Sequence, residues 1–214
     1  MADRRGTEAP STSGAAPAAT AEAMSSDGPA GMTLTDPRQM RALAHPTRLR
    51  LIGLLRSDGP MTATQAGCRL GESSGTMSFH LRQLAKYGMV EETGLGTGRQ
   101  KPWRATAAFT SWAAAPAAPE LADATQHLGR VLAARYGEIA QQWVERQPAE
   151  TTEWREAAQF GDSLMYLTAP ELHSLGEQLA ALLKPYGNRA HDHAQRPAGC
   201  RLVTWLHLVF PAEA

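Results

Sequence analysis

Apolar residues between positions 36 and 88 recur every three or four residues, which is the spacing of helices that bury one face. Turn chemistry interrupts the pattern at Pro46, at 57–60 and at Gly71, because proline and glycine interrupt helices. The pattern therefore predicts four short helices. The residues expected to face inward are Met40, Leu43, Ala44, Leu49, Ile52, Leu55, Met77, Leu81 and Leu84.

Capping residues indicate where the first two helices begin and end. Asp36 can cap a helix whose first residue is Pro37. Pro46 is expected to end that helix, because proline lacks an amide hydrogen and restricts the residue before it. Thr47 is then placed to cap a second helix that runs through Arg56.

The third and fourth predicted helices are short and follow each other closely. Residues 62–65 have the form of a capping box that opens the third helix, which ends at Leu70. One of the two serines at 73–74 can cap the fourth helix, which stops at Gly88, a residue suited to a left-handed C-terminal position. Two short helices joined by about three residues make a helix-turn-helix.

The outer face of the fourth helix carries hydroxyls, an aromatic ring and a guanidinium. Hydroxyls can bond base edges, Phe79 can contact a thymine methyl group, and Arg82 can bridge guanine or hold a phosphate. Gly75 would let backbone amides at the positive helix end approach a phosphate. A generic capped surface helix would have a similar composition. The candidate DNA contacts on this helix are Ser74, Gly75, Thr76, Ser78, Phe79 and Arg82.

Two strand-like segments, 89–93 and 103–106, flank a glycine-rich basic segment at 94–101. Such a hairpin is typical of a wing, since glycines let its tip lie close to the sugar-phosphate backbone. Arg99 and Lys101 supply charge that displaces counterions from DNA. As a nucleotide phosphate loop the GLGTG sequence is a weak match, because no Lys-Ser or Lys-Thr ending and no helix follow.

Charge is distributed unevenly, although the formal net charge of the whole chain is zero. Residues 38–104 contain 11 Lys and Arg against 4 Asp and Glu, so this segment carries +7 and the remainder −7. A basic module beside an acidic one is the electrostatic footprint of a DNA-binding domain, although solvated surface charge is the plainer explanation of a charge count alone. Helix, wing and regional charge together predict a winged helix-turn-helix that binds double-stranded DNA.

Three motifs carry a resemblance to a known family. Residues 41–52 read RALAHPTRLRLI, residues 78–84 read SFHLRQL, and residues 87–90 read YGMV. In these motifs, and in the order of helices, turn and wing, the chain resembles the ArsR-type winged-helix regulators, over about a third of its length. The resemblance implies a homodimer whose recognition helices enter successive major grooves about 34 Å apart on a near-palindromic operator, and repression by blocking polymerase.

The resemblance fails at the metal sites of that family. Cys68 stands alone where many members have paired cysteines, and Asp123 and His127 lack further partners of the His-x-x-His kind. His191 and His193 lie in a polar stretch where a solvated loop is favoured over a zinc site. We therefore predict no metal and no other cofactor. With Cys200, the chain has two cysteines and no disulfide framework.

The segment 120–147 is predicted to form one long amphipathic helix that ends before Pro148. Its apolar stripe could pack on its own domain, but the family resemblance favours pairing with the same helix of a second copy. Joining two weak DNA-binding heads in this way would make binding to a long site possible. The stripe consists of Leu121, Leu128, Leu132, Tyr136, Ile139 and Trp143.

The remaining segment is predicted to form a small strand-helix-strand unit. Strands are expected at 163–167 and 201–210, although a helix fits the second segment nearly as well. Between them, a capping box at 168–171 opens a helix that runs through Lys184 and ends at 185–187. The tail is rich in aromatic residues, which could line a small-molecule pocket, although core packing is the commoner use.

These observations divide an α+β chain into four parts. Residues 1–31 are predicted to be a disordered tail, 32–110 a winged helix-turn-helix, 111–148 a linker and dimerisation helix, and 149–214 a small α+β domain. No apolar run approaches the roughly 18 residues of a membrane helix, so a cytoplasmic location is expected. No constellation of catalytic residues stands out, so no enzyme activity is predicted.

The predicted function is a dimeric DNA-binding repressor that a small-molecule effector in the C-terminal part releases. Two alternatives remain open from the sequence. The winged fold could serve as a protein-interaction module whose acidic tail binds a partner. Alternatively, Cys68 and the stretch containing His191 and His193 could sense metal or redox state.

Overall fold

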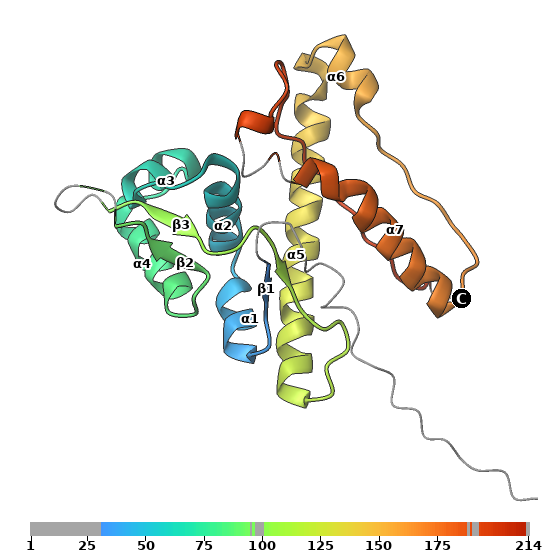
Figure 1. Ribbon diagram of the computed structural model, residues 1–214, viewed down its shortest axis with the longest axis horizontal. Helices are drawn as coiled ribbons and strands as arrows, with labels where there is room; N and C mark the ends of the chain where they lie inside the picture. Colours follow the sequence, from blue (N-terminus) through green and yellow to red (C-terminus); the bar gives the residue numbers. More distant parts are fainter. Residues whose placement is uncertain (1–30, 95, 97–100, 188, 190–192, 213–214) are drawn as a thin grey trace, which may run out of the picture.

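The computed structural model describes residues 31–94, 96, 101–187, 189 and 193–212, and their fold is α+β (Figure 1). A head of four short helices and two small sheets lies on one side of a long helix, and the helix at 169–187 lies on the other side. The helices are α1 (Pro37–Leu43), α2 (Pro46–Asp58), α3 (Ala63–Leu70), α4 (Ser74–Ala85), α5 (Pro119–Arg146), α6 (Thr152–Ala157) and α7 (Ala169–Gly187), with 3-10 helices η1 (Gln147–Ala149) and η3 (His193–Gln195). The strands are β1 (Met32–Thr33), β2 (Val90–Glu92), β3 (Trp103–Ala105) and β4 (Thr110–Ser111).

The start of α2 differs from the prediction. Pro46 is the first residue of α2 and does not end α1, which stops at Leu43. The cap is the side chain of His45, whose Nδ1 accepts a hydrogen bond from the amide of Thr47 at 3.2 Å. Proline suits this place because the first amides of a helix have no intrahelical acceptor, so its missing N–H costs nothing.

The helix-turn-helix has the predicted capping. Thr62 and Gln65 form the reciprocal capping box at the start of α3, and Gly71 ends that helix in the left-handed region with a φ of 72°. Of the two candidate serines, Ser73 caps α4, because its Oγ accepts from the amide of Thr76 at 3.0 Å. Side chains therefore cap the start of both helices, and the left-handed glycine ends α3 at the turn between them.

Two small sheets complete the head. In the wing, β2 and β3 pair antiparallel, with Val90 opposite Ala105, and Met61 adds a bridge to Trp103. The second sheet, β1 beside β4 in parallel, was not predicted from the sequence. It ties the residues before α1 to those before α5, so that α5 begins close to the head.

The core lies between α1, α2, α4 and the first half of α5. Leu128 and Ala124 of α5 are completely buried in it, and the hydroxyl of Thr125 donates to the sulfur of Met40 in α1 at 3.3 Å. The N-terminal half of the α5 stripe therefore packs on its own domain. The largest fully buried side chains are Leu34, Met40, Leu43, Leu51, Met77, Leu81, Leu84, Met89, Val90 and Leu128.

The C-terminal part differs from its predicted strand-helix-strand form. Neither 163–167 nor 201–210 is a strand, and both segments are exposed. A strand needs a neighbour for its amide and carbonyl groups, and no backbone hydrogen bond within the described residues joins either segment to another. The helix between them, α7, continues past Lys184 to Gly187, since Pro185 lies in its last turn and removes only one hydrogen bond there.

Candidate nucleic-acid interface

The helix α4 is held by an apolar stripe and exposes the opposite face. Met77, Leu81 and Leu84 have no exposed surface and pack against the other head helices. On the outer side Phe79 is 53% exposed, and Arg82 is also exposed. The structure therefore presents the ring and the guanidinium on a rigidly seated helix, which is the arrangement that base readout requires.

The N-terminus of α4 is open in front. Ser74 and Gly75 are exposed, and a Cβ placed on Gly75 would have only the Oγ of Ser73 within 4 Å, at 3.6 Å. Thr76 and Ser78 are half-buried, and the hydroxyl of Thr76 lies 2.9 Å from that of Ser73. The first turn of α4 contains no acidic residue, so its amides that do not bond Ser73 can offer a positive helix end to a phosphate.

The wing carries its charges as ion pairs across β2 and β3. The Nζ of Lys101 lies 2.9 Å from a carboxylate oxygen of Glu92, and Arg104 pairs with Glu91 at 2.6 Å. All four side chains are substantially exposed, and exposed pairs of this kind contribute only about 0–1 kcal/mol. A phosphate can therefore replace Glu92 as the partner of Lys101 at little cost. Arg99, the other predicted wing contact, lies outside the described residues.

A histidine pair beneath α4 was missed by sequence reasoning. His80 is only 7% exposed, and its ring lies 4.7 Å from that of His45, centroid to centroid. Burial lowers the pKa of both histidines, and the positive charge of Arg48 lowers both further. His80 Nδ1 and Arg48 Nε are buried without a hydrogen-bond partner among the described residues. The sequence placed these residues only inside the two longest motifs, RALAHPTRLRLI and SFHLRQL, without a role.

These features define a winged helix-turn-helix DNA-binding domain. A family model described as a helix-turn-helix domain matches residues 43–93, from the end of α1 to just beyond β2. The chain is therefore a DNA-binding transcription regulator. A search of curated proteins finds no match.

The other site predictions concern metals and membranes. Within the described part of the chain, no three His, Cys, Asp or Glu side chains gather where they could hold a metal ion. Cys68 and Cys200 are exposed free thiols, whereas His191 and the side chain of His193 lie outside what the structure describes. None of the described helices has the length and apolar character needed to cross a bilayer.

Proposed function

We propose that the chain is a sequence-specific transcriptional repressor that binds DNA as a homodimer and is released by a small-molecule effector. The observation that carries the proposal is the exposed polar face of α4, seated on a fully buried stripe and preceded by an open, capped N-terminus. In this reading Arg82 reads a base edge, the first amides of α4 hold a phosphate, and Lys101 contacts the backbone beside the groove.

The dimer is supported by apolar surface that the single chain leaves uncovered. In the second half of α5, Val144 is 54% exposed and Trp143 is half-buried. The resemblance to ArsR-type regulators, in which this helix pairs with its counterpart, points the same way. Two heads joined through α5 would reach successive major grooves and gain the effective concentration that one short recognition helix lacks.

The test is a selection of bound sequences from random DNA by the full chain. We expect a near-palindromic site with half-sites one helical turn apart, and a particle of twice the monomer mass in sedimentation. Arg82→Ala should change base preference at one position of each half-site. Lys101→Ala should instead weaken all sites alike and lower the slope of log affinity against log salt by about 1 per half-site.

Three results would each overturn one of these assignments. Binding that is independent of both salt and sequence would refute the DNA-reading role of α4. Identical effects of Arg82→Ala and Lys101→Ala on every sequence would refute the division between base and phosphate contacts. A monomeric particle bound to a single half-site would refute the dimer while leaving the head assignment intact.

A second candidate function is a protein-interaction module, and the exposed apolar C-terminal segments favour it. Phe160, Leu164 and Phe210 are each more than 70% exposed, and apolar side chains exposed to this extent would gain from a protein partner that covers them. This candidate predicts a chain that captures a protein partner through residues beyond 150 and shows no selected DNA site. Recovery of a palindromic site in the selection decides against it.

A further inference from the structure

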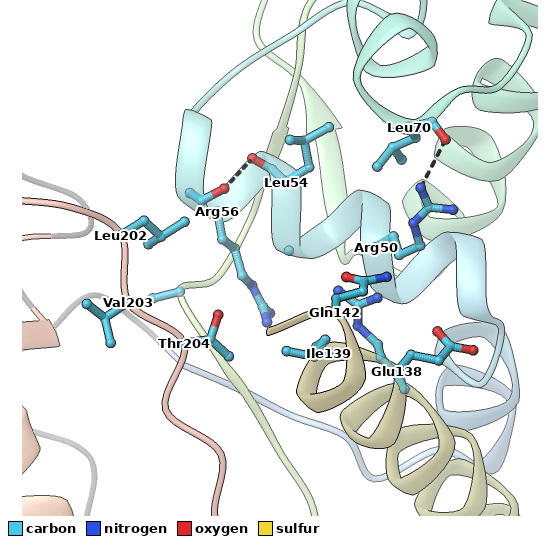
Figure 2. A pocket seen from close by; sticks show the side chains of 14 residues that line it. Arg50, Leu54, Arg56, Leu70, Glu138, Ile139, Gln142, Leu202, Val203 and Thr204 are labelled. Carbon is cyan, nitrogen blue, oxygen red and sulfur yellow. Dashed lines mark hydrogen bonds between the residues drawn. The ribbon is translucent and has the colours of Figure 1, made fainter. Parts of the chain in front are cut away.

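A cavity of about 660 Å³ lies where the head, α5 and a C-terminal segment meet. Three arginines line it, Arg50 and Arg56 from α2 and Arg135 from α5, and Glu138 is the acidic residue among the lining side chains. The lining therefore has a net charge of +2. Figure 2 shows Arg56 extending from α2 across the cavity toward Ile139 of α5, with residues 202–204 along another wall.

The guanidinium groups have free donors directed at this space. Arg56 uses its Nε for the carbonyl of Ala107 at 2.9 Å, and neither Nη has a partner among the described residues. Arg135 makes no hydrogen bond to a described residue. Its pKa is lowered mainly by burial and further by the neighbouring charge of Arg50. Burial lowers the pKa of Arg56 to about 10, so it remains charged at neutral pH. The three half-buried cations share one carboxylate, that of Glu138, whose charge raises the pKa of Arg135. The two positive charges left unbalanced cost stability, which an anion would restore.

The rest of the lining is mostly apolar, with Ser57, Gln142 and Thr204 as its polar side chains, and its C-terminal part is held in position. Arg201 donates to both carboxylate oxygens of Glu150, at 2.8 and 2.9 Å, and its guanidinium lies 4.8 Å from the ring centroid of Trp154. This fork fixes the start of the segment whose next residues, Leu202 and Val203, line the cavity at 76% and 63% exposure. Their exposed side chains would gain from covering by an apolar ligand body.

We propose that this cavity binds a small organic anion, a carboxylate or phosphate ester with an apolar body, and that this anion is the effector of the regulator. The acid group would take the fork donors of Arg56 and Arg135, as guanidinium pairs do with carboxylate and phosphate. The apolar body would lie against Ile139 and the segment 202–204. The effector role of the anion rests on the proposed function, whereas the binding of the anion rests on the cavity alone.

Arg50 connects the cavity to the helix-turn-helix. Its Nη2 donates to the carbonyl of Leu70 at 2.9 Å, the last residue of α3, and so satisfies a carbonyl at the end of the helix that precedes the turn to α4. An anion in the cavity competes for the same guanidinium. Loss of the bond to Leu70 would loosen the α3 terminus and the turn that positions α4, and DNA affinity would fall.

Binding is tested first without DNA, by calorimetry and thermal unfolding of the full chain. The probes are indole-3-acetate, decanoate and phenyl phosphate, with indole-3-acetamide as the uncharged counterpart. We expect at least one anion to bind and to raise Tm while the amide does neither. Arg135→Met should weaken anion binding about tenfold or more, the loss of one charge-assisted hydrogen bond, and should raise the Tm of the ligand-free chain. Arg146→Met, on the same helix but outside the cavity, is the matched control and should leave anion binding unchanged.

Glu138→Gln gives the opposite sign, because it removes the negative charge from the lining and should tighten anion binding several-fold. If none of the three anions binds at millimolar concentration, or if Arg135→Met and Arg146→Met bind them equally, the anion site is refuted. The binding anion is then added to a complex with the selected DNA, where we expect release, and weaker release with Arg135→Met. Anion binding without any effect on DNA affinity would overturn the effector role and keep the site, whereas failure to select any DNA would count against the proposed function alone.

Discussion

Gly67 tests whether the turn between α3 and α4 is as tightly built as the structure indicates. A Cβ on this residue would lie 2.5 Å from the carbonyl oxygen of Glu72 and 3.4 Å from the carbonyl carbon of Ser73. Both are backbone atoms of the turn, and the amide of Glu72 also donates to the carbonyl of Gly67 at 3.0 Å. Gly67→Ala must therefore move the turn itself, and with it the Ser73 cap of α4.

The magnitude follows from comparison with a second glycine. Gly53 lies inside α2 and a Cβ there would meet nothing within 4 Å, so Gly53→Ala should stabilise the chain by about 0.5–1 kcal/mol through helix propensity. Gly67→Ala gains the same propensity but adds overpacking, which costs about 1–3 kcal/mol. Since the propensity gain cancels, the difference between the two variants measures the clash alone.

Urea unfolding of both variants, fitted with a common m value, measures that difference. We expect Gly53→Ala above the parent chain in free energy of unfolding and Gly67→Ala below it by up to about 2 kcal/mol. Binding to the selected DNA should weaken for Gly67→Ala only, because the displaced turn carries α4. Equal stability of the two variants would show that the turn accommodates a Cβ at Gly67 and would refute the clash with the carbonyl of Glu72.

Two further predictions concern the core and the histidine pair. Leu128→Ala should lower the free energy of unfolding by about 2–5 kcal/mol, because Leu128 is completely buried. Leu164→Ala, at an 88% exposed position, should change it by less than about 0.5 kcal/mol. Equal losses for the two variants in urea titrations would contradict the packing of α5 on α1. Because His45 and His80 have lowered pKa values in the folded chain, the unfolded chain binds more protons below pH of about 6.5, so stability is full above that pH and falls below it. A His45→Asn, His80→Gln double variant should lose less stability between pH 7.5 and 5.5, and an unchanged pH dependence would contradict the assignment.

The head could be predicted because its information is local. Met77, Leu81 and Leu84 lie on one face of a single helix, so their spacing alone indicates which side is buried, and the structure leaves none of them exposed. The capping box of Thr62 and Gln65 is likewise complete within four residues. The outer face of α4 followed from the same periodicity, although what it contacts stays a prediction.

Features that depend on distant partners were not predictable in this way. The β1–β4 pair joins Met32 to Thr110 over two residues per strand, too few for any alternation to show. The prediction of strands at 163–167 and 201–210 was wrong because these segments have no partner strand in the part of the chain that the structure describes. Their residues have strand-forming character, but character does not supply the neighbouring strand that pairs their backbone groups. Pro46 shows a third limit, since a proline is compatible both with the end of one helix and with the start of the next.

The two halves of α5 limit how a signal can reach the DNA-binding face. Ala124 and Leu128 anchor the first half in the head core, so the head cannot rotate about α5 without breaking fully buried contacts. Arg135 lies seven residues beyond Leu128, about 10 Å along the helix, where α5 leaves the core and lines the cavity. Because the buried contacts hold α5 in place, an effector bound beside Arg135 would displace a residue on the opposite side of the cavity and would leave α5 where it is. That residue is Arg50, whose bond to Leu70 ends α3, so we expect regulation to change the helix-turn-helix internally, without a swing of the whole head.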